Sequence, residues 1–407
     1  MKVVRFLLII FALLLKWEPA GAAPVPVRIE KTADGFRLLR DGKPYYIQGA
    51  GGKSYLDQLK KAGGNSVRTW GAEDLPVVIP QAEKLGLTVT AGLWMGHERH
   101  GFSYFDREAV QRQLEKFRRE VEKYRDSEAM LMWGVGNEVE GMGVNAQVWR
   151  SINEVAVMIK RLDTNHPVMT VLSDITPLKI KALKAYCPDV DLIGINSYGG
   201  LATLAERLEQ SGWTEKPYIV SEFGNKGPWE SSRVMWNVAR ELSSSQKADY
   251  FADQYQQFIS SQRPRCLGSY VFYWGWKQEY TGTWHGMFSK EGERLQTVDA
   301  MSFAWTGSWP TNRAPVVEGI DCAAAGMVVA PGMRIVARVN ATDPDGDPLK
   351  YRWMVQYESR DKRRGGDAEG VPPEYPGALV ENKGELVLVK TPTKEGAFRL
   401  VVHVTDG

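Results

Sequence analysis

The segment Met130-Leu-Met-Trp-Gly-Val-Gly-Asn137-Glu138 decides the fold that we expect for this chain. It is an apolar run, typical of a buried strand, and it stops on a carboxylate. The segment Pro217-Tyr-Ile-Val-Ser-Glu222-Phe-Gly224 has the same form. In a parallel barrel the carboxyl ends of the strands meet at one edge, where active sites are built. We therefore expect Glu138 and Glu222 to project from different strands at that edge.

Strand and helix patterns alternate on both sides of these two segments. The predicted strands are 45–49, 66–70, 87–94, 130–137, 168–172, 192–196, 218–222 and 268–274. The segments with helical periodicity are 54–62, 76–85, 107–124, 146–162, 177–185, 201–210 and 248–261. Eight strands separated by helices over about 285 residues predict a (β/α)8 TIM barrel in residues 23–309. An open doubly wound sheet is the alternative, but Gly49-Ala50-Gly51-Gly52 is a poor match to the glycine turn that it needs.

The pattern changes after residue 309. Residues 310–315 contain two prolines and read as a linker. Short alternating segments at 333–339, 349–355, 385–389 and 399–404 predict a small, Ig-like all-β sandwich in residues 316–407, with an exposed loop at 360–376. Because Gly407 directly follows a predicted strand, a truncated sandwich is an open alternative.

The first 22 residues have the features of a secretory signal peptide. Lys2 and Arg5 precede an apolar run at 6–15, and small residues at 20–22 supply a cleavage site. Ten apolar residues are too few to span a bilayer, so we expect no membrane span in the mature form. The expected location is periplasmic or extracellular, with a retained membrane anchor as the alternative.

Composition excludes several classes of partner. Charged residues make up 25% of the 407 residues and the net charge is +2, which gives no sign of a nucleic-acid partner. The 14 tryptophans, many near strand ends, fit a carbohydrate cleft as well as core packing. The three cysteines, Cys187, Cys266 and Cys322, cannot all be paired, and we expect buried free thiols.

Two carboxyl groups at the mouth of a barrel are suited to glycoside hydrolysis. Glu138 ends the fourth predicted strand and Glu222 the seventh, so the two side chains face each other across the mouth. One carboxyl must be protonated to give its proton to the leaving oxygen, while the other must be ionised to attack. A retaining mechanism requires the two groups to lie roughly 5–5.5 Å apart.

The two segments also resemble a known group of enzymes. The segment from Trp133 to Glu138 resembles the Asn-Glu acid/base motif of clan A glycoside hydrolases, and Ser221-Glu222-Phe-Gly224 resembles their nucleophile motif. Residues 41–49 and 65–70 resemble the first two strands of the family 2 barrels in this clan. The resemblance covers about residues 25–309 and implies retaining hydrolysis on a TIM barrel.

The resemblance also implies a role for each matching residue. Glu138 is implied to be the general acid and then the general base, and Glu222 the nucleophile. Asn137 is implied to bind the sugar 2-hydroxyl. The other implied site residues are Arg68 and Tyr198, which hold Glu222, together with Trp70 and the sugar platform Trp274.

Several further residues are weaker candidates. His97, Trp276 and Gln278 are possible sugar contacts from loops after strands three and eight. A metal reading of His97-Glu98-Arg99-His100 is less favoured, since no other clustered ligand supports it, and we expect neither a metal nor a cofactor. Asp343, Asp345 and Asp347 form an acidic turn that could bind calcium, although an Asx-rich turn is the favoured interpretation.

The sequence therefore predicts an exported retaining glycoside hydrolase acting on β-linked glucan or a related β-glycan, with an oligosaccharide or polysaccharide as its partner. Three alternatives remain open. A transglycosidase (glucanosyltransferase) would use the same two glutamates. A catalytically inactive carbohydrate-binding protein would keep only the cleft, and a surface adhesion protein would depend on the sandwich.

Overall fold

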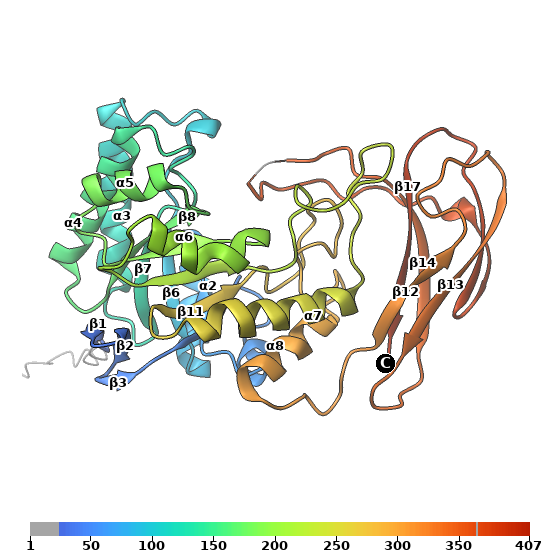
Figure 1. The fold of residues 1–407 in the computed structure, drawn as a ribbon, viewed down its shortest axis with the longest axis horizontal. Helices are drawn as coiled ribbons and strands as arrows, with labels where there is room; N and C mark the ends of the chain where they lie inside the picture. The colour runs from blue at the N-terminus through green and yellow to red at the C-terminus, as the bar shows by residue number, and fades with distance from the viewer. Residues whose placement is uncertain (1–23, 364) are drawn as a thin grey trace, which may run out of the picture.

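The computed structural model describes residues 24–363 and 365–407. The predicted signal peptide, residues 1–22, lies outside the described residues. Figure 1 shows two bodies side by side, a helix-wrapped barrel and a domain of antiparallel strands. No helix in the described part of the chain is both long and apolar enough to cross a bilayer.

Eight parallel strands close the predicted barrel, which confirms the fold prediction. Their order around the ring is β10-β11-β4-β5-β6-β7-β8-β9. The strands are β4 (Ile47–Gly51), β5 (Ser66–Arg68), β6 (Thr88–Leu93), β7 (Met130–Val135), β8 (Val168–Ser173), β9 (Leu192–Asn196), β10 (Tyr218–Phe223) and β11 (Cys266–Val271). β7 and β10 are buried along their whole length, as their apolar sequences predict.

Helices cover the outside of the ring. They are α1 (Leu56–Lys61), α2 (Leu75–Leu85), α3 (Arg107–Tyr124), α4 (Ala146–Leu162), α5 (Pro177–Tyr186), α6 (Leu204–Gln210), α7 (Ser244–Gln254) and α8 (Gln296–Thr306). The shorter helical segments are η1 (Ala72–Asp74), η2 (Glu98–His100), η3 (Gly199–Thr203), η4 (Tyr255–Ile259) and η5 (Ser260–Gln262). Side chains cap several N-termini; the Asp106 carboxylate, for example, accepts from the amide of Ala109 at 3.0 Å and fixes the start of α3. Helix α8 lies outside the predicted helices, because its buried face includes the polar residues Thr297, Asp299 and Ser302 and therefore lacks a clear apolar period.

A short N-terminal hairpin packs on the barrel interior. Its strands are β1 (Val27–Thr32), β2 (Gly35–Arg40) and β3 (Lys43–Pro44). Val27, Phe36 and Leu38 belong to the same apolar cluster as inward-facing residues of the barrel strands. The ring of Tyr270 fills the barrel beside Gly49, where a Cβ atom would lie 2.4 Å from the ring carbons, so this position requires glycine.

The C-terminal domain consists of two antiparallel sheets. One sheet has the order β12-β13-β16-β15, and the other pairs β14 with β17. The elements are β12 (Val316–Cys322), β13 (Arg334–Thr342), β14 (Lys350–Tyr357), η6 (Pro376–Ala378), β15 (Leu379–Lys383), β16 (Leu386–Lys390) and β17 (Phe398–Thr405). Trp353, Val339 and Val387 form its core, as expected for an all-β sandwich. β12 and β15 were not predicted, because their sequences alternate only weakly.

Polar contacts join the sandwich to the barrel. The Arg399 guanidinium donates to the carbonyl of Ala239 at 3.2 Å, and the Val317 amide donates to Ser245 Oγ on α7 at 2.7 Å. In the acidic turn, Asp343 Oδ1 accepts from the amides of Asp345 at 2.8 Å and Asp347 at 3.0 Å, which is an Asx-type arrangement. All three cysteines are free, and Cys187 and Cys266 are buried.

Candidate active site

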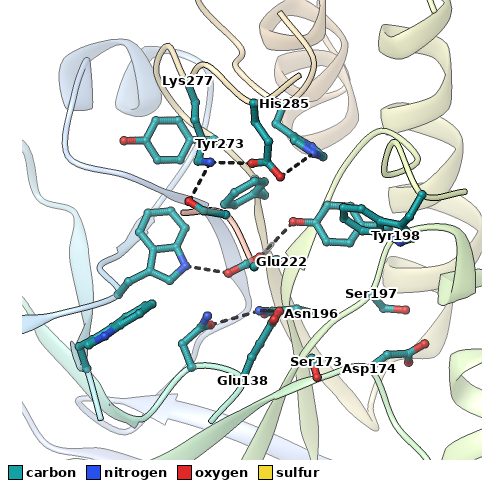
Figure 2. A pocket seen from close by; sticks show the side chains of 18 of the residues that line it. Glu138, Ser173, Asp174, Asn196, Ser197, Tyr198, Glu222, Tyr273, Lys277 and His285 are labelled. Carbon is teal, nitrogen blue, oxygen red and sulfur yellow. Dashed lines mark hydrogen bonds and ion pairs between the residues drawn. The ribbon is translucent and has the colours of Figure 1, made fainter. Parts of the chain in front are cut away.

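A cavity of about 650 Å³ opens where the barrel strands end, and Glu138 and Glu222 both line it. Figure 2 shows the two glutamates among the side chains of this cavity. Asn137, Tyr198 and Trp70 line it as well, while Arg68 lies beneath it with 2% of its surface exposed. The structure thus brings together the site residues that the sequence predicted from strands two, four, six and seven.

Glu222, on β10, is surrounded by hydrogen-bond donors. Its Oε1 accepts from the Arg68 guanidinium at 2.9 Å and from the Trp70 indole at 2.7 Å. Its Oε2 accepts from the Tyr198 hydroxyl at 3.0 Å. Three donors, one of them a buried cation, favour the ionised form of a carboxyl group. These contacts fix the position of the Glu222 carboxyl group.

Glu138 has much weaker support for a negative charge. Its Oε1 accepts one hydrogen bond, from the Asn196 amide at 2.7 Å. Burial and then the negative charge of Glu222 raise the pKa of Glu138 to about 7, against the lowering effect of the Asn196 hydrogen bond. A carboxyl group with this pKa keeps its proton in a large fraction of molecules near neutral pH, as a general acid requires.

The backbone at Glu138 is unusual. Its φ is +54°, a left-handed conformation that is uncommon for residues other than glycine, and Gly136 has φ of +71°. The Glu138 amide donates to the carbonyl of Val171 on the neighbouring strand β8 at 3.0 Å. Such conformations persist where surrounding contacts impose them, often at functional sites. Here the turn places the carboxyl group of Glu138 in the cavity.

A chain of amides connects the two glutamates. Asn137 Oδ1 accepts from the Arg68 guanidinium at 2.7 Å and from Asn196 Nδ2 at 3.1 Å. Ser221 Oγ in turn donates to Asn196 Oδ1 at 2.8 Å, which fixes the orientation of that amide. With its oxygen occupied in this way, Asn137 presents its amide NH2 group to the cavity. An amide donor at this place is suited to a sugar hydroxyl.

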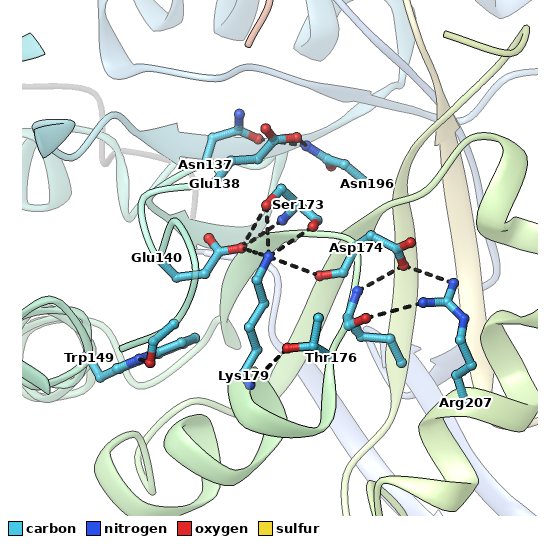
Figure 3. A network of polar contacts seen from close by, with 12 residues as sticks. Asn137, Glu138, Glu140, Trp149, Ser173, Asp174, Thr176, Lys179, Asn196 and Arg207 are labelled. Atoms are coloured by element: carbon cyan, nitrogen blue, oxygen red, sulfur yellow. Dashed lines mark hydrogen bonds and ion pairs between the residues drawn. The ribbon is translucent and has the colours of Figure 1, made fainter. Parts of the chain in front are cut away.

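A buried ion pair lies below the Glu138 turn (Figure 3). The Lys179 ammonium donates to Glu140 Oε1 at 2.7 Å and to Ser173 Oγ at 2.8 Å. Glu140 Oε1 also accepts from the amide of Ser173 at 2.9 Å. Lys179 is on α5, so the pair ties the segment after β7 to the end of β8 and its helix. The pair stabilises the loop that carries Glu138.

A second ion pair, between Lys277 and Glu279, lies on the cavity wall opposite Glu138 (Figure 2). The Lys277 ammonium donates to Glu279 Oε2 at 2.6 Å, and both residues line the cavity. His285, which also lines it, is uncharged at neutral pH, because burial and then the positive charges of Lys277 and Lys247 lower its pKa to about 3. This wall therefore offers hydrogen-bonding groups and no unpaired positive charge among the described lining residues.

Aromatic rings form the remaining surface, but Trp274 is not one of them. Trp70 stacks on Tyr273 with ring centroids 5.5 Å apart, and both line the cavity, as do Trp94, Phe272 and Trp229. Trp274 is 1% exposed, packs on Phe288, and donates its indole N–H to the carbonyl of Tyr55. This placement corrects the expectation that Trp274 is the sugar platform: β11 ends at Val271, so the chain has already turned at residue 274.

The weaker candidates also lie outside the cavity lining. His97 and Gln278 are buried, and Trp276 is half-buried; none of the three is among the lining residues. Glu98 accepts from Asn145 and His100 pairs with Asp367, so these side chains and His97 form no metal-binding group in the described part of the chain. The sequence reasoning missed Asn196, Trp94, Asp174 and Tyr273, of which Asn196 had a usable signal as the last residue of a predicted strand.

Comparisons with known proteins agree with this geometry. Residues 57–285 match the model for the TIM barrel domain of glycosyl hydrolases family 2. The chain belongs to glycosyl hydrolase family 2. The matched span contains both glutamates and all the hydrogen-bond donors described around them.

Two mannosidases are among the similar curated proteins. The probable mannan endo-1,4-beta-mannosidase F of Aspergillus flavus is 23% identical over 329 residues, which cover 59% of this chain and 70% of the relative. The mannan endo-1,4-beta-mannosidase F of Aspergillus clavatus is 25% identical over 334 residues, which cover 60% of this chain and 76% of the relative.

Solved family 2 structures share the fold. A beta-D-glucuronidase from Dictyoglomus thermophilum is 19% identical with a TM-score of 0.53, covering 70% of this chain and 54% of its own. A Bacteroides uniformis beta-glucuronidase, 14% identical with a TM-score of 0.54, covers 93% of this chain and 48% of its own. This family 2 chain thus spans about half the length of the solved structures that it matches.

Proposed function

We propose that this protein hydrolyses β-linked glycans of uncharged sugars, of the glucan or mannan type, with retention of anomeric configuration. The observation that carries the proposal is the opposite environment of two carboxyl groups in one cavity. Glu222, which accepts hydrogen bonds from Arg68, Trp70 and Tyr198, attacks the anomeric carbon and forms a glycosyl-enzyme. Glu138 first gives its proton to the leaving oxygen and then takes one from water.

The charge of Glu222 couples the two steps. While Glu222 is ionised, its negative charge keeps the pKa of Glu138 high and its proton in place. In the step that forms the ester, Glu138 gives its proton to the leaving oxygen and Glu222 loses its charge, so the Glu138 carboxylate is no longer destabilised and can take a proton from the incoming water. One interaction between neighbouring carboxyl groups thus switches the role of Glu138 during each cycle.

The charges of the cavity favour uncharged sugars. Seven acidic side chains line it: Glu73, Asp74, Glu138, Asp174, Glu222, Glu230 and Glu279. Lys277 is the one lysine or arginine among the described lining residues, and it is already paired with Glu279 at 2.6 Å. A uronic acid would bring a further negative charge with no free cation to meet it. Sugar hydroxyls, in contrast, can donate to these acidic side chains. The glucuronidases therefore share the barrel, while the cavity of this chain supports a neutral substrate.

Hydrolysis of matched substrates tests this proposal. We expect the purified protein to cleave aryl β-glucoside or β-mannoside and the corresponding polysaccharide, and to leave the aryl β-glucuronide intact. Proton NMR of the first product should show the β anomer before mutarotation. An α anomer, or preferred cleavage of the glucuronide, would contradict the proposal.

The same experiment distinguishes hydrolysis from transglycosylation. With an added oligosaccharide acceptor, a hydrolase yields mainly free sugar, whereas a transglycosidase yields lengthened products that mass spectrometry detects. Turnover by the wild type excludes an inactive carbohydrate-binding protein. We also propose that the protein is exported, on the basis of its predicted leader, and mass measurement of the N-terminus of the secreted protein tests cleavage after residue 22.

A further inference from the structure

The sandwich domain contributes to the active-site cavity through one long loop. This loop follows β14, and its described parts, residues 358–363 and 365–375, reach from the sandwich toward the barrel in Figure 1. Gly365 and Gly366 line the same cavity as Glu138 and Glu222. If the loop has a role at this cavity, specific contacts should fix it against the barrel. We call these contacts its anchors.

The first anchor joins the loop to the segment after β6. Asp367 Oδ2 lies 3.0 Å from His100 Nε2, and Asp367 Oδ1 lies 3.4 Å from the Arg99 guanidinium. Partial burial acts to raise the pKa of Asp367, but the hydrogen bond from His100 and the charge of Arg99 lower it below its usual value. This carboxylate is therefore stabilised by the barrel residues that it contacts.

The second anchor joins the loop to the segment after β11. Glu369 Oε2 accepts from the amide of Tyr280 at 2.6 Å. Lys277, which lines the cavity, donates to the carbonyl of Gly366 at 3.1 Å. The Lys362 ammonium also lies 4.9 Å from the centre of the Tyr280 ring. Two hydrogen bonds and one cation–π contact thus fix the loop against this rim of the cavity.

The positions of the two contacted segments, after β6 and after β11, show which part of the barrel mouth the loop covers. β11 and β6 are separated in the ring by β4 and β5 only. We propose that residues 365–369 form a wall of the substrate cleft above this side, so that the sandwich determines how a glycan chain lies in the site. This inference rests on the proposed function, because it assumes that the cavity binds a glycan.

The uncovered side offers a surface for further sugar units. Trp229, after β10, lines the cavity and is 59% exposed, with its ring edge-on to Tyr198 at a centroid distance of 5.9 Å. An exposed indole can stack on the apolar face of a sugar ring. A glycan that is blocked by the loop on one side therefore extends past Trp229.

Two glycines provide a matched test of the wall. Gly366 has φ of +73°, and the nearest atom to an added Cβ is the Lys277 ammonium nitrogen at 3.7 Å. Gly332, in a sandwich loop outside the cavity lining, has φ of +72°, and its nearest atom is Lys390 Cε at 3.7 Å. Asparagine tolerates this left-handed conformation better than most residues. Gly366→Asn and Gly332→Asn thus impose the same backbone cost, and only the first adds atoms to the cavity.

We expect Gly366→Asn to raise KM for a short β-linked oligosaccharide about tenfold, which corresponds to about 1.4 kcal/mol. Gly332→Asn should leave KM unchanged, with equal melting temperatures for the two variants. The double variant Asp367→Ala/Glu369→Ala, which releases both anchors, should also raise KM, whereas Asp345→Ala, which loses only a contact to the Arg313 amide, should not. Equal KM values for Gly366→Asn and Gly332→Asn would overturn the inference.

Binding measurements separate this inference from the proposed function. In the Glu222→Gln background, calorimetry with the same oligosaccharide should give a weaker Kd for Gly366→Asn than for Gly332→Asn. If the wild type binds the glycan but does not turn it over, the proposed hydrolysis fails while the ratio of Kd values still decides the role of the loop. If the Glu222→Gln protein with an unaltered loop binds no glycan, both ideas are overturned.

Discussion

Glu138 lies just after strand β7 and Glu222 near the end of β10 of the same barrel, yet their surroundings differ sharply. Glu222 accepts hydrogen bonds from a guanidinium, an indole and a phenol. Glu138 accepts one, from the Asn196 amide, and has a pKa raised to about 7. The same side chain is therefore prepared for two tasks by its neighbours alone.

The different environments of Glu138 and Glu222 show that the proposed mechanism depends on the surrounding hydrogen-bond donors as much as on the two carboxyl groups. Arg68 contributes to both surroundings, since one end of its guanidinium donates to Glu222 and the other to Asn137. Asn137 and Asn196 then transmit this orientation to the carboxyl group of Glu138. Substitutions that remove the carboxyl groups or their hydrogen-bond donors make the environments of Glu138 and Glu222 more similar. The larger this change is, the more it should reduce activity.

Removal of the carboxylates themselves should have the largest effect. We expect Glu222→Gln to lower kcat by about 10⁴-fold or more for every substrate, because no other group can form the glycosyl-enzyme. Glu138→Gln should cost about 10²–10⁴-fold for substrates that need a proton on the leaving oxygen. It should cost much less for a nitrophenyl glycoside, whose leaving group needs no proton.

Steady-state kinetics on an alkyl and a nitrophenyl glycoside measure this contrast. Glu154→Gln, at a surface position on α4, serves as the control and should keep wild-type rates. If the two active-site variants responded equally to the leaving group, the assignment of acid and nucleophile would be incorrect.

Loss of the shared cation should have the next largest effect. Arg68→Met keeps most of the buried volume and removes the charge beside Glu222, as well as the donor to Asn137. We expect kcat/KM to fall about 10³-fold, which is typical for the loss of one preorganised donor at a reacting charge. Arg119→Met, at an exposed position of α3, should leave kcat/KM unchanged.

The smallest effect concerns stability. The pKa of Glu138 is about 7 in the folded protein against an ordinary value of 4.5, so the folded state binds more protons between these pH values. The contribution of Glu138 to the free energy of unfolding is therefore most favourable below pH 4.5, and this contribution is lost as the pH rises toward 7. Glutamine does not titrate, so Glu138→Gln removes this pH dependence. The difference in unfolding free energy between the variant and the wild type should therefore increase, by at most about 3 kcal/mol, from pH 5 to pH 8.

Denaturant unfolding at the two pH values measures this gain. In the wild type, the alkaline limb of kcat/KM should lie near pH 7, because Glu138 must carry its proton to act as an acid. An equal free-energy difference between variant and wild type at both pH values would show that Glu138 titrates normally.

The sequence was sufficient for the ring and for its two glutamates. Eight strand patterns spaced by helices predict a barrel, and a carboxylate that follows an apolar run identifies Glu138 and Glu222 without any knowledge of contacts. The resemblance to clan A glycoside hydrolases implied that Arg68 and Tyr198 contact Glu222, and both donate hydrogen bonds to it in the structure. The predictions for the two glutamates succeed because one local rule, the end of a strand, determines their position.

The failures concern residues whose position depends on loops. The expected eighth strand extended to residue 274, whereas β11 ends at Val271, so Tyr273 faces the cavity and Trp274 packs away from it. The contact between Asp367 and His100 joins residues 267 positions apart, and no local pattern predicts such a pairing. A loop of one domain that reaches the cavity of another can be found only from the structure.

The anchoring of that loop has a consequence for heating experiments. A protein of two bodies commonly melts in two steps, and measurements of helix content follow the barrel step. Because Gly365 and Gly366 line the cavity, partial melting of the sandwich should disturb the cavity while the barrel helices remain intact. The temperature at which turnover fails would then report the melting of the smaller body, several degrees before the helical signal is lost.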